Sequence, residues 1–200
     1  MLEGLKPFYN NVLRPAARFL CNTGIQPNHI TLLGLALFTA AGWFCSTGQW
    51  TTALILVVFG ALMDGLDGVL ARESDKKTVF GAILDSSCDR LTEMVLLMGI
   101  LMYFLKSEVV NQLGVILCFA SICGSVMVSY IKARCEGAGI SCKSGILQRP
   151  ERVIILSIGL LAGPPSMVWI LSALTFFSWI TVVQRIFEAA DNSRKIQQEN

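Results

Sequence analysis

The chain has 200 residues, enough for one domain, but its composition is not that of a soluble protein. Hydrophobic residues make up 54% of it and charged residues 15%, whereas a soluble domain carries about 25% charged residues. The hydrophobic content excludes a disordered chain or a coiled coil, and a net charge of +2 gives no basis for a nucleic acid partner. The sequence therefore indicates an integral membrane protein.

The first 22 residues place apolar side chains at helical spacing on one side and basic or polar side chains on the other. This pattern is typical of a helix that lies in the membrane interface. Its apolar face would carry Leu5, Phe8, Val12, Ala16, Phe19 and Leu20.

Apolar segments follow from residue 31 onward, and a helix needs about 20 mostly apolar residues to cross a bilayer, although the fifth segment, 151–163, is shorter. We predict an all-α integral membrane fold in one domain, residues 1–200, with an interfacial helix over 1–22, a six-helix bundle over 31–186 and a cytoplasmic tail over 187–200. The six transmembrane helices are expected at 31–48, 51–71, 80–105, 109–133, 151–163 and 165–186.

Lysine and arginine are distributed unequally between the two sides of this arrangement. Ser46–Trp50, Lys106–Glu108 and Gly163–Ser166 together contain one basic residue, whereas the other connections and the two ends contain fourteen. Because basic residues accumulate on the cytoplasmic side, both termini are expected in the cytoplasm and the protein in the cell membrane.

The cysteines offer no recognisable metal or disulfide pattern. There are seven, with no pair at CxxC spacing, and His29 is the one histidine. An odd number without short paired spacings favours buried thiols over a zinc site.

Four aspartates fall within the second and third predicted spans, where a charged residue costs ~2.5–3.5 kcal/mol or more and is a functional candidate. Asp64 and Asp67 are three residues apart, and Asp85 and Asp89 are four apart, so each pair shares a helix face. The short loop Glu73–Thr78 joins the two helices, so the two pairs can meet at one depth.

Four neighbouring carboxylates cannot all remain ionised without compensation. Oxygen ligands favour hard divalent cations such as Mg²⁺ or Mn²⁺, and a two-metal carboxylate site suits phosphoryl transfer. Two alternatives stay open: a proton or cation pathway in a carrier, and an ion-pair cluster with Arg72 and Arg90.

The spacing of these residues resembles the signature of the CDP-alcohol phosphotransferase family, D-x2-D-G-x2-A-R-x8-G-x3-D-x3-D. All eight fixed positions match. They are Asp64, Asp67, Gly68, Ala71, Arg72, Gly81, Asp85 and Asp89. The six-span plan and the interfacial helix resemble the family as well, so the likeness covers nearly the whole chain.

The resemblance implies that the enzyme transfers a phosphoalcohol from a CDP-alcohol to a second alcohol and releases CMP. The four aspartates would bind two Mg²⁺, with Mn²⁺ as a substitute, and Asp89 would also act as general base. Contacts to CDP-diacylglycerol would come from Pro27, Asn28, His29, Ile30, Thr31, Gly68, Ala71, Arg72, Thr78 and Gly81. Residues 27–31 have a second interpretation, plain helix entry with Asn28 as N-cap, and the two are compatible.

The acceptor is indicated by cations on the same side as the aspartates. Residues 132–152 and the end of the last span contribute Lys132, Arg134, Lys143, Arg149, Arg152 and Arg185. The positive-inside rule accounts for their number but not for Arg185 within an apolar span, so we expect a pocket for a phosphorylated acceptor. These segments resemble the prokaryotic phosphatidylinositol-phosphate synthase branch of the family and its archaeal relatives, which implies that Lys132, Arg152 and Arg185 hold the phosphate of inositol 1-phosphate.

The sequence leaves two alternatives with the same chemistry and disfavours two from other classes of protein. Glycerol 3-phosphate as acceptor would use the same catalytic residues, and an archaeal ether lipid, CDP-archaeol, is an alternative donor. A cation-coupled carrier or a non-catalytic scaffold is disfavoured, because the chain shows no inverted repeat and a scaffold has no need of four intramembrane carboxylates. The expected partners are the two substrates, the lipid bilayer and a second copy of the chain, since relatives are homodimers.

Overall fold

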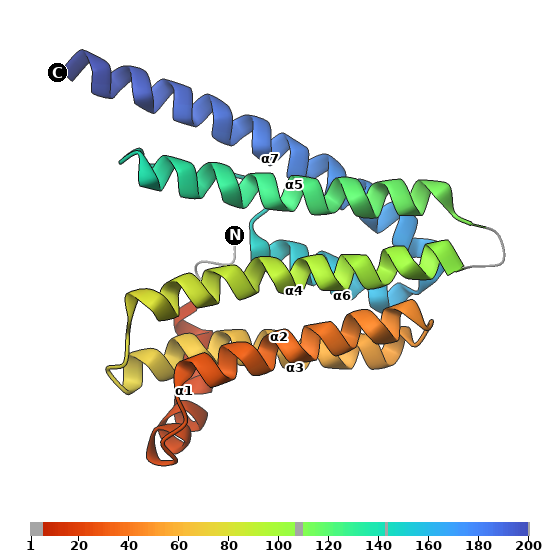
Figure 1. The fold of residues 1–200 in the computed structure, drawn as a ribbon, viewed down its shortest axis with the longest axis horizontal. Coiled ribbons are helices and arrows are strands. Elements are labelled where there is room, and N and C mark those ends of the chain that lie inside the picture. The colour runs from red at the N-terminus through yellow and green to blue at the C-terminus, as the bar shows by residue number, and fades with distance from the viewer. Residues whose placement is uncertain (1–5, 107–109, 143, 200) are drawn as a thin grey trace. The chain divides into compact units, whose positions relative to one another are not determined.

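In the computed structural model, the described residues 6–106, 110–142 and 144–199 form seven helices and no strand (Figure 1). Side chains are described for residues 11–195 within these ranges. The start of the predicted 1–22 helix, most of the predicted Lys106–Glu108 connection, Lys143 and the last residue of the tail lie outside them. The helices are α1 (Lys6–Asn22), α2 (Pro27–Ser46), α3 (Trp50–Glu73), α4 (Val79–Lys106), α5 (Gln112–Gly137), α6 (Arg149–Ala162) and α7 (Pro164–Glu199).

The six predicted spans correspond in order to α2 through α7, with one large difference at the end. α7 does not stop at residue 186 but continues to Glu199, so the predicted tail is helical wherever it is described. The turn expected around Gly163 is present, because Gly163 adopts φ +84°, a left-handed conformation that separates α6 from α7.

Four of the described helices, α2, α3, α5 and α7, are long and apolar enough to cross a membrane. α4 has 28 residues but carries Asp85, Asp89, Arg90 and Glu93. α6 has 14 residues and is about 21 Å long, less than the roughly 30 Å of a hydrocarbon core. The described residues therefore form an all-helical membrane protein with four such helices.

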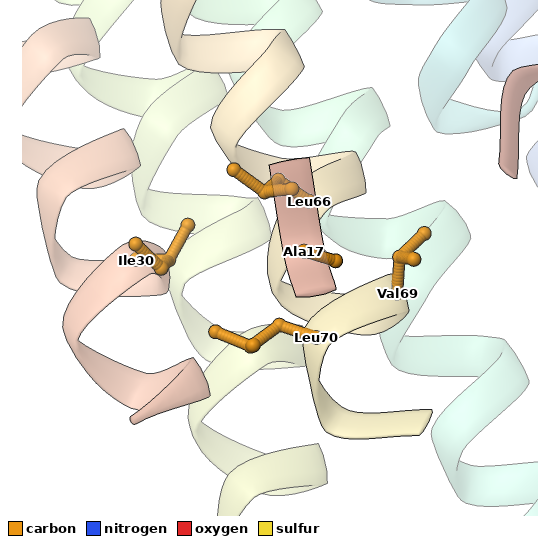
Figure 2. Close-up of a cluster of buried hydrophobic side chains, with 5 residues drawn as sticks. All are labelled: Ala17, Ile30, Leu66, Val69 and Leu70. Carbon is orange, nitrogen blue, oxygen red and sulfur yellow. The ribbon is translucent and has the colours of Figure 1, made fainter. Parts of the chain in front are cut away.

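The chain divides into two compact units, residues 1–103 and 104–200. In the first unit α2 and α3 pack along each other, and α1 packs on α3. A cluster of buried side chains joins the three helices at one end (Figure 2). It comprises Ala17 from α1, Ile30 from α2, and Leu66, Val69 and Leu70 from α3.

α1 has two apolar faces rather than the one expected. Leu13, Ala17 and Leu20 face the cluster, and Ala17 is fully buried. Val12 and Phe19, from the predicted apolar face, are 60% and 70% exposed. The helix thus packs against α3 on one side and presents apolar side chains outward on another.

α2 and α4 approach each other closely through two glycines. A Cβ on Gly42 would lie 2.5 Å from the Val95 carbonyl oxygen, and a Cβ on Gly99 would overlap the backbone of Gly42. The missing side chains permit backbone-to-backbone packing of the kind that small residues allow between membrane helices.

In the second unit α7 packs along α5 and against α6 (Figure 1). Polar groups join α5 to α7: the hydroxyls of Ser121 and Thr175 are 2.8 Å apart, and the Trp179 indole donates to the Ala120 carbonyl at 3.3 Å. Gly159 of α6 leaves room for Met167 of α7.

All seven cysteines are free thiols. Five are buried as expected, whereas Cys21 and Cys123 are partly exposed.

Candidate active site

Three of the four aspartates converge. One carboxylate oxygen from each of Asp64, Asp85 and Asp89 lies within 4.8 Å of the other two. Asp64 comes from the last turns of α3, while Asp85 and Asp89 occupy adjacent turns near the start of α4. The short connection between these helices brings the carboxylates together, as the spacing predicted.

Asp67, the fourth aspartate, is not a member of this trio and is hydrogen-bonded to α2. Its side chain is buried, and its Oδ2 accepts a hydrogen bond from the Thr31 hydroxyl at 2.5 Å. The threonine thus fixes the carboxylate against α2, an orientation that no spacing within α3 could indicate.

The set of donor atoms fits a divalent cation. Around Mg²⁺, oxygen ligands lie about 2.9 Å apart when adjacent and about 4.2 Å apart when opposite. The trio lies within a comparable span and offers oxygen ligands alone, which favours a hard ion over zinc.

A cavity of about 240 Å³ adjoins the trio through Asp85. It collects residues from α2, α3, α4 and the connection between α3 and α4. Its lining is Pro27, Asn28, Thr31, Asp67, Gly68, Ala71, Arg72, Lys76, Lys77, Thr78, Gly81, Ala82 and Asp85.

Glycines shape two parts of this lining. The Arg72 guanidinium folds back over Gly68, with Nη1 3.6 Å from where a Cβ would be. Gly81 leaves space for Asn28, whose Oδ1 would be 3.3 Å from a Cβ there. The Thr78 hydroxyl accepts a hydrogen bond from the Gly81 N–H at 2.9 Å and so closes the first turn of α4.

Two residues of the predicted donor site, His29 and Ile30, are not part of this lining. Ile30 packs into the cluster of Figure 2, and His29 is exposed. The helical period explains the difference, since residues 27, 28 and 31 share a side of α2 that 29 and 30 do not. The N-cap prediction for Asn28 is wrong: α2 begins at Pro27 with Gln26 as N-cap.

Lys76 and Lys77 line the cavity but were counted in the sequence only as cytoplasmic charges. Their place between Arg72 and Thr78, both expected to contact the donor, was the signal that could have identified them. Together with Arg72 they bring three cations into a lining that also contains two aspartates.

The last turn of α3 is bonded to α1 next to Arg72. Glu73 Oε1 is 2.5 Å from Arg14 Nε, and Glu73 Oε2 is 3.0 Å from Arg18 Nε. Arg14 and Arg18 are one turn apart, so one carboxylate spans two points on α1.

The cations expected to bind the acceptor belong to the second unit. Arg152 and Arg185 are buried, 2% and 6% exposed, and close enough for their positive charges to repel. Arg152 Nη1 donates to the Leu147 carbonyl at 3.2 Å, and Arg185 donates to the carbonyls of Ser144 and Val128. Lys132 is exposed and 3.7 Å from Glu136. The sequence did not indicate that the guanidiniums of Arg152 and Arg185 would donate hydrogen bonds to backbone carbonyls.

These features define a helical membrane enzyme with a carboxylate centre beside a polar cavity. A family model described as CDP-alcohol phosphatidyltransferase matches residues 25–187. The chain belongs to this family, and it is a transferase.

Similar proteins narrow the branch of the family. The archaetidylinositol phosphate synthase of Pyrococcus horikoshii is 37% identical over 94% of this chain and 96% of its own. The phosphatidylinositol phosphate synthase of Mycobacterium marinum is 33% identical over 90% and 80%. Two crystal structures of the Mycobacterium tuberculosis phosphatidylinositol phosphate synthase resemble this chain, and their sequence is 32% identical to it. One with CDP-DAG bound has a TM-score of 0.83 over 90% of this chain and 94% of its own. One with manganese and citrate has a TM-score of 0.81 over 88% of each.

The bond between Thr31 and Asp67 gives a first prediction. Thr31→Val keeps the shape but removes the donor, and a hydrogen bond to a charged group contributes ~1.5–3 kcal/mol. We expect the Mg²⁺ concentration for half-maximal CMP release to rise roughly tenfold, because Asp67 is no longer fixed. Mg²⁺ titration of CMP release measures it.

Thr39→Val is the matched control, since the Thr39 hydroxyl donates only to Leu35 in its own helix. An equal change in both variants would contradict the role of Thr31.

Proposed function

We propose that the chain transfers the phosphatidyl group of CDP-diacylglycerol to a hydroxyl of myo-inositol 1-phosphate, forming phosphatidylinositol phosphate and releasing CMP. The observation that carries the proposal is Asp85, which belongs both to the carboxylate trio and to the cavity wall. The M. tuberculosis structure with CDP-DAG bound supports the donor, and the names of the mycobacterial relatives support the product.

In the proposed reaction, the inositol oxygen bonds to the phosphorus that carries the diacylglycerol. The bond from that phosphorus to the bridging oxygen of the diphosphate breaks, and CMP leaves with this oxygen. Asp89 takes the hydroxyl proton on a carboxylate oxygen as general base.

The carboxylates would hold two divalent cations, Mg²⁺ or Mn²⁺, through Asp64, Asp67, Asp85 and Asp89. Such ions neutralise a diphosphate and stabilise the charge on a leaving phosphate. The geometry of the trio and the manganese in the M. tuberculosis structure support this assignment.

The cavity would bind the CDP moiety. Arg72 is suited to pair with a phosphate as a planar fork, and Asn28 and Thr78 offer further polar groups in the lining. Gly68 and Gly81 have no side chain and Ala71 has only a methyl group, so a ligand can approach the backbone at these positions.

In the second unit, Arg152 and Arg185 would bind the phosphate of the acceptor together with Lys132. Both guanidiniums are buried in the same unit, and the planar fork of an arginine is suited to bind a phosphate, which supports this role.

We place the protein in the cell membrane with six crossings and both termini in the cytoplasm, as a homodimer. The order of helices α2–α7 supports the six crossings. α1 would lie on the membrane surface, which the exposed Val12 and Phe19 support.

An archaeal ether lipid is the second candidate donor. The archaetidylinositol phosphate synthase of P. horikoshii, which is 37% identical to this chain, favours this donor. The chemistry and the catalytic residues would be the same.

CMP release by the detergent-purified protein with Mg²⁺ tests the function. Each donor, CDP-diacylglycerol or CDP-archaeol, is paired with inositol 1-phosphate, glycerol 3-phosphate, free inositol or serine. Release with inositol 1-phosphate alone supports the proposal, and the better donor decides the lipid. Release with another acceptor replaces the acceptor assignment, and no release with any pair contradicts the proposed reaction.

Lys132→Ala tests the acceptor site with an exposed side chain whose loss does not disturb a core. We expect the KM for inositol 1-phosphate to rise roughly tenfold, because a charge-assisted contact to phosphate is lost. The KM for CDP-diacylglycerol should stay within about twofold. Steady-state CMP release measures both.

Arg134→Ala, an exposed cation of the same helix, is the control and should change neither KM. Equal rises of both KM values in Lys132→Ala would argue against a phosphate pocket.

A further inference from the structure

One face of α7 carries a row of polar side chains that extends past the predicted end of the last span at residue 186. Thr181, Arg185, Glu188 and Asn192 follow one another at intervals of four, three and four residues. This spacing places them on one helix face. Glu188 and Asn192 belong to the stretch 187–200, which the sequence analysis assigned to a cytoplasmic tail.

Each of these side chains binds part of the connection between α5 and α6, within residues 141–142 and 144–147. This part is called segment 141–147 below, and its Lys143 lies outside the described residues. Thr181 Oγ1 accepts from the Leu147 N–H at 3.2 Å, and Arg185 Nε donates to the Ser144 carbonyl at 3.0 Å. Asn192 Nδ2 donates to the Ser141 carbonyl at 2.7 Å. The contacts therefore fix the backbone of the segment at several points.

Glu188 makes two of these contacts with a single oxygen. Its Oε2 accepts from the Ser144 N–H at 2.9 Å and from the Ser144 hydroxyl at 2.6 Å. Hydrogen bonds to an ionised carboxylate are roughly twice as strong as neutral ones. Ser144 is thus held from both sides, by Glu188 at its N–H and by Arg185 at its carbonyl.

The same segment fixes both buried guanidiniums. Arg185 donates to its Ser144 carbonyl and Arg152 to its Leu147 carbonyl. The negative charge of Glu188 also acts on Arg185, opposite in sign to that of Arg152. Glu188 therefore orders the segment and offsets part of the repulsion between the two cations.

We propose that Glu188 is a positioning residue for acceptor binding: by holding Ser144 against α7, it fixes segment 141–147 and with it the guanidiniums of Arg152 and Arg185. The inference rests on the proposed function, since these cations would bind the acceptor's phosphate. Glu188 itself does not touch the substrate in this role.

The experiment compares Glu188→Ala and Glu188→Gln with the unmodified protein. Steady-state CMP release gives the KM for inositol 1-phosphate and for CDP-diacylglycerol, and hydrogen–deuterium exchange gives the protection of segment 141–147. We expect Glu188→Ala to raise the acceptor KM at least roughly tenfold and the donor KM less than about twofold, with faster exchange in the segment. Glu188→Gln should give a smaller change in the same direction.

Asp191→Asn is the matched control, an exposed carboxylate on the same helix, and should change neither KM nor exchange. Ser144→Ala removes the hydroxyl bond alone and should raise the acceptor KM moderately, which keeps the test available if Glu188→Ala does not fold.

Three results overturn the inference: an acceptor KM within twofold of the unmodified protein in Glu188→Ala, an equal rise of both KM values, or unchanged exchange in the segment. Each presupposes that the unmodified protein releases CMP with inositol 1-phosphate. If it does not, the proposed function fails first and the positioning role fails with it.

Discussion

We expect Asp89→Asn to yield a folded protein that has lost nearly all of its CMP release. Asparagine has nearly the same shape as aspartate but cannot accept the acceptor's proton, and its amide is a weaker cation ligand. A general base contributes about 10²–10⁴-fold, so with the weakened cation site we expect CMP release to fall by about 10³-fold or more. Steady-state CMP release measures the loss, and thermal unfolding in detergent shows whether the fold is kept.

The control is Asp75→Asn, in the connection between α3 and α4. Asp75 is exposed and adopts φ +53°, a conformation that asparagine also tolerates. This variant should keep its activity within about twofold. Turnover of Asp89→Asn close to that of the unmodified protein would remove Asp89 from the proposed base role.

The second large effect concerns the crossing of α2 and α4. In Gly99→Ala the new Cβ overlaps the backbone of Gly42, and backbone atoms cannot move aside as a flexible side chain does. The helices must separate along the crossing, so we expect destabilisation of about 3 kcal/mol. α4 carries Asp85 and Asp89, so activity should fall as well. A lower unfolding temperature in detergent is the measurement.

Gly137→Ala is its counterpart at the end of α5, where a Cβ meets nothing within 4 Å. Alanine favours helix over glycine by up to about 1 kcal/mol, so this variant should be neutral or slightly more stable. If Gly99→Ala unfolds at the same temperature as Gly137→Ala, the close crossing is not a source of stability.

The helices and the carboxylate trio could be predicted because both depend on local spacing. Apolar runs interrupted by glycine and proline place the helices, and aspartates three and four residues apart share a helix face. A short connection then leaves little freedom in how α3 and α4 meet. This is why Asp64, Asp85 and Asp89 converge as expected.

What could not be predicted depends on contacts between distant residues. The sequence after 186 turns polar, which favours an end to the span. α7 nevertheless continues, and in this part Glu188 and Asn192 bond to residues more than 40 positions earlier. Likewise, the Thr31 partner of Asp67 is 36 residues away on another helix. No periodicity within one helix carries such information.

The pair of arginines on Glu73 determines how α1 is turned about its own axis. A helix fixed at one point can still roll, but Arg14 and Arg18 engage both oxygens of one carboxylate one turn apart, and Ala17 sits between them against α3. Rolling would break at least one of these contacts. Glu73, the residue that follows Arg72 of the cavity, therefore sets the direction in which Val12 and Phe19 project. This direction is fixed within the protein and does not depend on contact with lipid.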